Sequence, residues 1–108
     1  MEGANVIFSY TEEAVTAFLP KEIDHHGAKS IREAIDLKFF ERLPKLLILD
    51  FSSTAFMDSS GIALIMGRCE LAGERGARVR IKGLSPVIKK LVFLSGIEKI
   101  KNLAISET

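Results

Sequence analysis

The residues of this chain that are best suited to chemistry lie together in segment 56–61, which reads Phe-Met-Asp-Ser-Ser-Gly. The segment falls between an apolar run that predicts a buried strand and an apolar helical pattern that begins at Ile62. It therefore places one carboxylate and two hydroxyl groups at the start of a helix. Because a helix N-terminus has unpaired N–H groups and a partial positive charge, it favours a phosphate. We therefore expect Ser59 to be a phosphorylation site that switches a small signalling protein.

The same residues, Asp58, Ser59, Ser60 and Gly61, also have a purely structural interpretation. Asp and Ser are ordinary N-cap residues, so the segment can be a helix cap without any further role. In that arrangement Met57 would form a hydrophobic staple with the first apolar residue of the helix. A phosphate on Ser59 would be attracted by the helix N-terminus and repelled by Asp58, so the fold could accommodate both states. A binding partner would then detect roughly two added negative charges.

A second group with chemical potential is the run Asp24-His25-His26. Two adjacent histidines without a cysteine or a further spaced histidine make a weak metal site, and we expect no metal. An alternative is a triad of Ser59, one loop histidine and Asp24, which would make the protein a small serine hydrolase. Since the chain lacks the Gly-x-Ser-x-Gly turn of such enzymes, we expect no catalytic residue and no enzymatic activity.

Other ligand classes have weaker support in the sequence. Neither the phosphate-binding P-loop motif nor the Gly-x-Gly-x-x-Gly turn is present, so we expect no bound cofactor. The residues Arg78, Arg80 and Lys82 alternate along one predicted strand and could meet nucleic acid. No aromatic residues are interleaved with them, so we expect no direct contact with nucleic acid.

Composition and charge describe one globular domain of 108 residues, 47% of them apolar, with a net charge of +1. The charge is uneven: residues 1–67 carry six Lys or Arg against ten Asp or Glu, and residues 68–108 carry nine against four. Such polarity could steer a protein partner. The single cysteine, Cys69, cannot form an internal disulfide and reads as a buried apolar residue. Without a signal-peptide pattern or an apolar run of about 20 residues, we expect a cytoplasmic protein without membrane contact.

Hydrophobic periodicity predicts the element order ββαβαβαβ. Strands are expected at 6–10, 14–19, 46–49, 78–82 and 101–105, helices at 27–40, 60–72 and 86–95, and a loop at 20–26. Each connection after the opening hairpin contains a helix, so parallel pairing is favoured there. Because the strand at 78–82 has one polar face, the helices should lie mainly on one side of the sheet. The sequence thus predicts an α/β fold with a mixed, mostly parallel sheet of about five strands.

The motifs taken together resemble the STAS-domain family of bacterial anti-sigma factor antagonists, especially its sporulation-type (SpoIIAA-like) members. The resemblance is carried by Glu22-Ile23-Asp24-His25-His26, by segment 56–61, by Gly67-Arg68 and by Leu94-Ser95-Gly96-Ile97. It covers nearly the whole chain in the family's order and spacing. It therefore implies the STAS fold, with a single STAS domain over residues 1–108.

The resemblance also implies a function for the segment around Ser59. Family members in the unphosphorylated state capture an anti-sigma factor that is also a serine kinase, which frees its sigma factor; phosphorylation ends the binding, and a PP2C-type phosphatase restores it. The implied phosphate acceptor is Ser59, and the implied partner-binding residues around it are Glu22, Asp24, His25, Asp58, Ser60 and Gly61. Asp24 would meet a basic residue of the partner, and Gly61 would allow its backbone to approach closely. The remaining alternative is a STAS scaffold that binds its partner constitutively, with Ser59 never modified.

Overall fold

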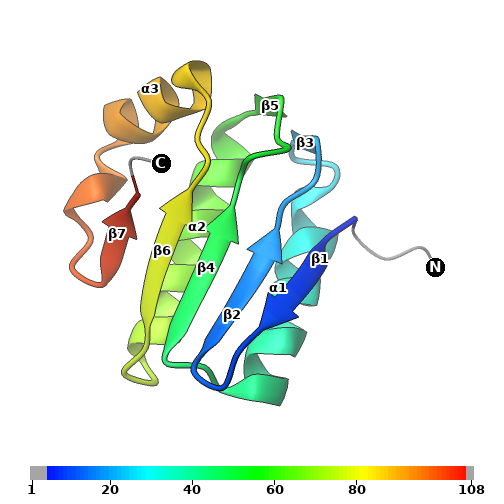
Figure 1. The fold of residues 1–108 in the computed structure, drawn as a ribbon. Coiled ribbons are helices and arrows are strands. Elements are labelled where there is room, and N and C mark those ends of the chain that lie inside the picture. Colours follow the sequence, from blue (N-terminus) through cyan, green and yellow to red (C-terminus); the bar gives the residue numbers. More distant parts are fainter. Residues whose placement is uncertain (1–4, 107–108) are drawn as a thin grey trace.

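Five strands form the main sheet of the computed structural model, which describes residues 5–106 (Figure 1). The strands are β1 (Ile7–Tyr10), β2 (Ala14–Phe18), β4 (Leu46–Asp50), β6 (Arg78–Lys82) and β7 (Leu103–Ile105), and they lie side by side in the order β1-β2-β4-β6-β7. The pairing of β1 with β2 is antiparallel, and the three other pairings are parallel. The predicted mixed, mostly parallel sheet is confirmed.

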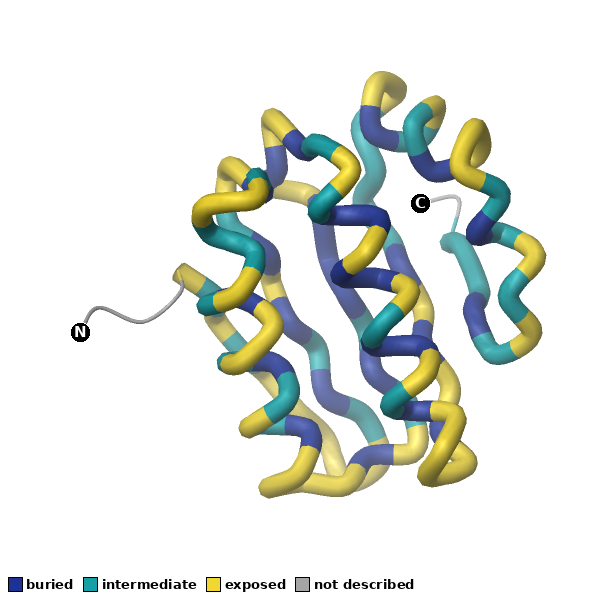
Figure 2. The backbone as a smooth tube through the Cα atoms, turned by 180° about the vertical axis from the view of Figure 1, so that it is seen from behind, coloured by how far each residue is buried: buried dark blue, intermediate teal, exposed yellow. Residues whose placement is uncertain are grey.

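Three α-helices accompany the sheet: α1 (Ala28–Arg42), α2 (Ser59–Gly73) and α3 (Pro86–Ser95). The view from behind shows α1 and α2 lying across the same face of the sheet, with α3 at the end where β2, β4 and β6 finish (Figure 2). The opposite face carries Arg78 and Arg80, which are exposed, and Leu46 and Ile48, which are half-buried. The predicted one-sided arrangement of the helices is thus confirmed, although β4 is less covered on its open face than its apolar run predicted.

The core lies between the sheet and the two long helices. Alternate residues of the strands supply one side of it, because side chains along a strand point to opposite faces. On β6, Val79 and Ile81 are fully buried while their neighbours are exposed or half-buried, as the alternation predicted. The helices contribute residues at helical spacing, which include Ile31, Ile35 and Phe39 of α1 and Ile62, Ile65, Cys69 and Ala72 of α2. Burial raises the pKa of the Cys69 thiol to about 11, in keeping with a structural cysteine.

The first helix ends two residues later than the predicted range. It runs to Arg42, and Leu43 then adopts a left-handed conformation with φ 46° while its N–H donates to the Phe39 carbonyl at 2.7 Å. Pro44 disfavours a helical conformation at the residue before it, so the helix stops there. The apolar face of α1 had already ended at Phe39, which is why the periodicity placed the boundary too early.

The segment expected to be a loop before α1 contains a short strand, and this part of the prediction is wrong. Strand β3 (Glu22–Ile23) pairs in parallel with β5 (Phe56–Met57), forming a separate two-stranded sheet. Two residues are too few to produce an alternation that the sequence could reveal. The pairing depends instead on the chain segments that the main sheet brings together.

The last connection also differs in detail from the prediction. A short 3₁₀ helix, η1 (Ile97–Lys99), follows α3, and β7 begins at Leu103 rather than at residue 101. The Asn102 side chain donates to the carbonyls of Cys69 and Ala77 at 3.0 and 3.1 Å. These bonds hold Asn102 in a turn. The alternation of polar and apolar residues that begins at Lys101 therefore does not mark a strand before Leu103.

Two glycines with positive φ differ in what surrounds them. Gly83 follows β6 with φ +74°, and a Cβ there would overlap the Ser52 side chain and lie 2.8 Å from the Ser52 backbone nitrogen. Gly96 ends α3 with φ +83°, and a Cβ there would meet nothing within 4 Å. The positive φ would strain the backbone of any other residue at both positions, but only at Gly83 would a Cβ atom also lack space.

We therefore expect Gly83→Ala to destabilise the fold more than Gly96→Ala. The left-handed conformation should cost about 1–2 kcal/mol in each variant. The overlap with Ser52 should add about 1–3 kcal/mol in Gly83→Ala alone. Urea unfolding of the two variants and the wild type measures the difference, and equal losses would contradict the close approach at Gly83.

Candidate functional site

The pairing of β3 with β5 brings the two candidate segments of the sequence together. Ile23 lies opposite Met57 in this pairing, and the Asp58 N–H donates to the Ile23 carbonyl at 3.1 Å. The loop that contains His25 therefore begins beside the start of α2. The ion-pair geometry reflects this, since His25 Nδ1 lies 3.9 Å from Asp58 Oδ2.

Asp58 is the N-cap of α2, as the sequence predicted. Its backbone is extended, and its Oδ1 accepts a hydrogen bond from the Ser60 N–H at 2.8 Å. This hydrogen bond is the main cause that lowers the pKa of Asp58. Desolvation opposes it, and the Ser60 hydroxyl and His25 lower the pKa further. The carboxylate is therefore held ionised at the start of the helix, where the helix dipole also favours negative charge.

The two serines that follow the cap differ in their surroundings. Ser59 is the first residue of α2 and is exposed, and the structure records no hydrogen bond from its hydroxyl to the residues it describes. Ser60 is half-buried, and the Asp58 carboxylate accepts from its N–H and lies within hydrogen-bonding reach of its hydroxyl. The accessible and uncommitted hydroxyl is thus that of Ser59.

Asp24 has an internal role at the start of α1. Its Oδ1 accepts from the N–H groups of His26 and Gly27, both at 3.0 Å, and its backbone carbonyl accepts from Ala28 at 2.9 Å. These bonds satisfy N–H groups that a helix N-terminus leaves unpaired. Asp24 is half-buried, while Glu22 and His25 are exposed. The expected contact of Asp24 with a partner's basic residue stays a prediction.

Gly61 faces the interior of this protein. It is buried, and a Cβ at this position would overlap the Met57 side chain. Met57 and Ile62 are both 8% exposed and belong to the same core, in keeping with the predicted staple around the cap. The glycine thus has a packing reason within the chain, and the close approach of a partner's backbone there stays a prediction.

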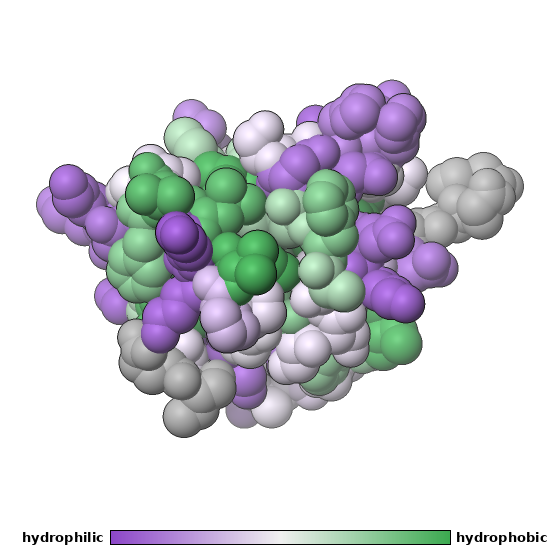
Figure 3. All heavy atoms as spheres, turned by 90° about the horizontal axis from the view of Figure 1, so that it is seen from above, coloured by the Kyte–Doolittle hydropathy of each residue, from purple (hydrophilic) through white to green (hydrophobic). Residues whose placement is uncertain are grey.

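The same end of the molecule exposes several large apolar side chains. Phe56 of β5 is 52% exposed, and Val87 and Leu94 of α3 are 78% and 77% exposed. Viewed from above, apolar side chains gather over this end with polar side chains around them (Figure 3). These three residues were not among the predicted site residues, because an apolar residue next to a cap or in a helix usually reads as core. We call them the apolar patch.

The described residues do not form the hydrogen-bonded triad of a serine hydrolase or the ligand cluster of a metal site. In residues 5–106 no recorded hydrogen bond or ion pair joins either histidine to Ser59; His25 approaches Asp58 and its ring lies 4.0 Å from that of His26. Within the same residues no group of three or more His, Cys, Asp or Glu side chains is placed to hold a metal ion. The described helices also include none that is long and apolar enough to span a bilayer.

Comparison with known proteins gives one family and several related structures. The model of the STAS domain family matches residues 7–108 of the chain. The anti-sigma F factor antagonist of Paenibacillus polymyxa is 32% identical over 82 residues, which cover 76% of this chain and 70% of that protein. The structure of the anti-sigma factor antagonist SpoIIAA in its unphosphorylated form has a TM-score of 0.78 at 28% identity, covering 94% and 87% of the two chains. The Bacillus cell fate determinant SpoIIAA in its phosphorylated form has a TM-score of 0.71 at 28% identity, covering 94% and 90%.

The lowered pKa of Asp58 predicts a pH-dependent contribution to stability. A carboxylate whose pKa is depressed in the fold stabilises the fold fully above the ordinary value of 3.8, and this contribution is lost as the pH falls from that value through the lower pKa of the folded state. Asp58→Asn keeps a side-chain oxygen for the Ser60 N–H but removes the titration. We expect the wild type to be slightly more stable than Asp58→Asn at pH 7 and to have a smaller advantage at pH ~3.

Urea unfolding at both pH values measures the effect. Glu12→Gln is the matched control, because it removes an exposed carboxylate for which the described residues show no ion pair. A difference between wild type and Asp58→Asn that is the same at both pH values would contradict the stabilised charge.

Proposed function

The chain belongs to the STAS-domain family, and we propose that this protein is an anti-sigma factor antagonist that phosphorylation of Ser59 switches off. In the unphosphorylated state it binds an anti-sigma factor that is also a serine kinase, and the bound sigma factor is released. After phosphorylation the antagonist dissociates, and a PP2C-type phosphatase restores the binding state. Such antagonists are regulators and not enzymes.

The observation that carries this proposal is the contrast between the two serines at the start of α2. Ser59 presents an exposed hydroxyl, whereas Ser60 is half-buried beside the Asp58 carboxylate. A kinase must place the acceptor hydroxyl in line with a phosphoryl group, so an accessible hydroxyl is the better acceptor. Related structures described as unphosphorylated and phosphorylated forms of SpoIIAA support a fold that accommodates both states.

Local electrostatics explain why the phosphate would act on the partner more than on the fold. A phosphate on Ser59 would bring roughly two negative charges to a helix N-terminus, which favours them. It would also lie next to Asp58, whose lowered pKa keeps it ionised at neutral pH. These opposing local effects leave the fold in place. A partner surface fitted to the unmodified serine would meet like charge or lack of space instead.

The proposed docking surface joins the apolar patch to the polar loop after β3. Exposed apolar groups that lie close together mark protein-binding sites more often than isolated ones do. Phe56 lies two residues before the cap of α2, so the patch reaches the proposed acceptor. The exposed Glu22 lies opposite Phe56 in the pairing of β3 with β5, and the exposed His25 approaches Asp58. We expect a partner with an apolar centre facing the patch and basic residues facing the loop.

We predict that Ser59→Asp binds the cognate anti-sigma factor at least about tenfold more weakly than the wild type, because a new negative charge would lie inside the interface. Ser59→Ala should bind like the wild type and should not accept phosphate from the kinase. Calorimetric titration measures the affinities, and intact-mass spectrometry after incubation with kinase and ATP measures the phosphate.

Ser60→Ala is the matched control, since it removes the neighbouring hydroxyl and should still be phosphorylated. Phosphate on Ser59→Ala but not on Ser60→Ala would move the acceptor to Ser60. Equal affinity of Ser59→Asp and wild type, with no phosphate in the peptide that contains Ser59 from cells in several growth states, would favour a constitutive scaffold and overturn the switch.

A further inference from the structure

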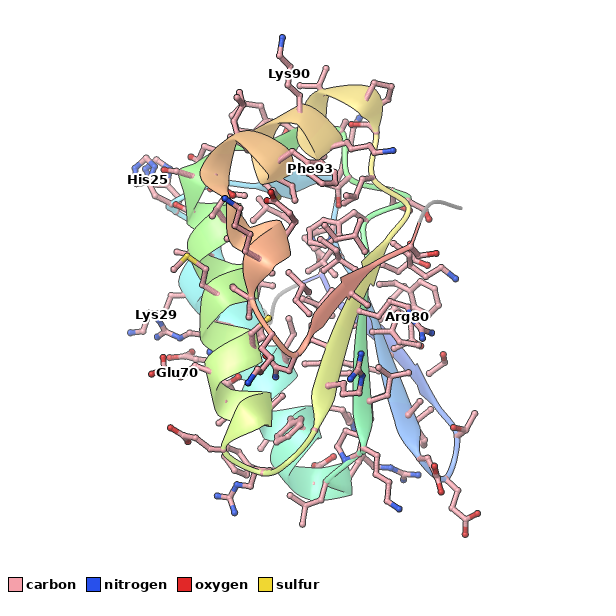
Figure 4. The ribbon with its side chains drawn as sticks, turned by 90° about the vertical axis from the view of Figure 1, so that its left-hand side faces the viewer. His25, Lys29, Glu70, Arg80, Lys90 and Phe93 are labelled. Carbon is pink, nitrogen blue, oxygen red and sulfur yellow. The ribbon has the colours of Figure 1, made fainter. Side chains whose placement is uncertain are left out.

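The face of the sheet opposite α1 and α2 carries a column of basic side chains along β6. Arg78, Arg80 and Lys82 share this open face, because the residues between them are buried on the other side. Arg78 and Arg80 are exposed, and Lys82 is half-buried. Viewed along the sheet, Arg80 lies on the open side, whereas His25 projects from the helical side (Figure 4). The three basic residues, which we call the basic column, are therefore separate from the site around Ser59.

Apolar side chains lie beside the basic column on the neighbouring strands. Leu46 and Ile48 of β4 are directly opposite the first two members of the column in the pairing with β6, and both are half-buried. Phe18 of β2 points to the same face, since it is two residues from Thr16, which is opposite Ile48. Its exposed fraction is 39%. We call Phe18, Leu46 and Ile48 the apolar band.

The basic column has no acidic partner within the described part of the chain. In residues 5–106 no carboxylate is within ion-pair distance of its three side chains. Asp50 is opposite Lys82 in the pairing of β4 with β6, but it is buried, and its Oδ1 accepts from the Ser52 N–H at 2.8 Å. The open face thus presents positive charge next to apolar surface. It is complementary to a partner that has acidic and apolar groups side by side.

The dimensions of the sheet favour a helix as that partner. Neighbouring strands are about 4.8 Å apart, so a helix about 10 Å wide that lies along β4 would also cover β2 and β6. Alternate residues of a strand are separated by about 6.6 Å, and residues four apart in a helix by about 6.0 Å. Acidic residues at this helical spacing would therefore come close to each member of the basic column in turn. The sheet already accepts helices in this way, because α1 and α2 lie across its other face (Figure 2).

Other occupants fit the open face less well. An extended peptide would leave its backbone groups unpaired there, because β6 lies between β4 and β7 and offers no free edge. A nucleic acid is held by several stacking aromatic rings, and the apolar band has one, that of Phe18. A bilayer takes up apolar side chains that protrude, whereas Leu46 and Ile48 are half-buried. A second copy of the chain would add a second positively charged face.

We propose that the open face of the sheet is a docking surface for an amphipathic helix of a partner protein. The helix places acidic residues on the basic column and apolar residues on the apolar band. This surface includes none of the residues around Ser59, so docking there is independent of the phosphorylation switch, and either can fail without the other.

The test is a titration of the isotopically labelled protein with a synthetic peptide, followed through the backbone amide signals in NMR spectra. The peptide is held helical by a hydrocarbon crosslink and carries three Glu-Leu pairs spaced four residues apart, so that acidic and apolar groups form two adjacent stripes. We expect saturable shifts in β2, β4 and β6. In the double variant Arg78→Gln/Arg80→Gln the affinity should fall about tenfold.

Two matched controls accompany the titration. Arg32→Gln/Lys90→Gln removes the same charge from exposed positions on α1 and α3, and it should bind like the wild type. Lys90 lies at α3, away from Arg80 (Figure 4). Phe18→Ala keeps the basic column and should bind about fivefold more weakly. Phe40→Ala, which removes a ring of similar exposure from α1, should leave the affinity unchanged.

Several results would overturn the docking surface. They are the absence of saturable shifts, shifts that centre on α1 and α2, and equal losses in the two double variants. Equal binding of a peptide with the same composition, but with its glutamates on the side of the helix away from the leucines, would show that charge alone attracts it. Tighter binding of vesicles that contain anionic lipid, or of a single-stranded oligonucleotide, would assign the face to a membrane or to nucleic acid and overturn the helix.

Discussion

The parallel pairing of β3 with β5 is the constraint on which the candidate site depends. The main sheet ends before this point, and its strands β2 and β4 release the chain into two segments that lead to α1 and α2. Backbone bonds join these segments: Ala55 donates to Lys21 at 2.7 Å and Asp58 donates to Ile23 at 3.1 Å. The buried Thr54 adds a hydroxyl bond to the Pro20 carbonyl at 2.8 Å. These contacts set the start of one helix relative to the start of the other.

This constraint explains how a small protein can present an exposed serine without a flexible loop. Ile23 and Met57 are buried beneath the pairing, so displacement of either strand would expose apolar surface to water. Ser59 is therefore attached to a fixed helix end, while its own side chain is exposed. A partner that binds at Ser59, as proposed above, would then meet a fixed surface, and the free energy of binding would not be spent on ordering a loop.

The sequence predicted most of the fold because most of it follows from hydrophobic periodicity. Strand β6 was located to the residue, since Val79 and Ile81 alternate with basic residues on the open face. The two short strands were missed because their pairing is a tertiary contact between segments more than thirty residues apart. At the site, the cap was predictable from Asp58 alone. The packing of Gly61 on Met57 was not, because nothing in the sequence gives the direction of the Met57 side chain.

The groove between α1 and α2, which Arg32 and Arg68 help to line, could not be predicted for a related reason. Arg32 and Arg68 belong to different helices, and only their packing brings both to one groove. A buried ion pair is weak evidence for stability, because apolar residues of similar volume often stabilise a fold equally well. The position of Arg68 in α2, between the buried Leu64 and Ala72, would suit an apolar side chain. At this depth the Arg68 guanidinium is held by the Asp36 carboxylate, which lies 2.9 Å from its Nε, and its Nη1 donates to the Leu64 carbonyl at 3.5 Å.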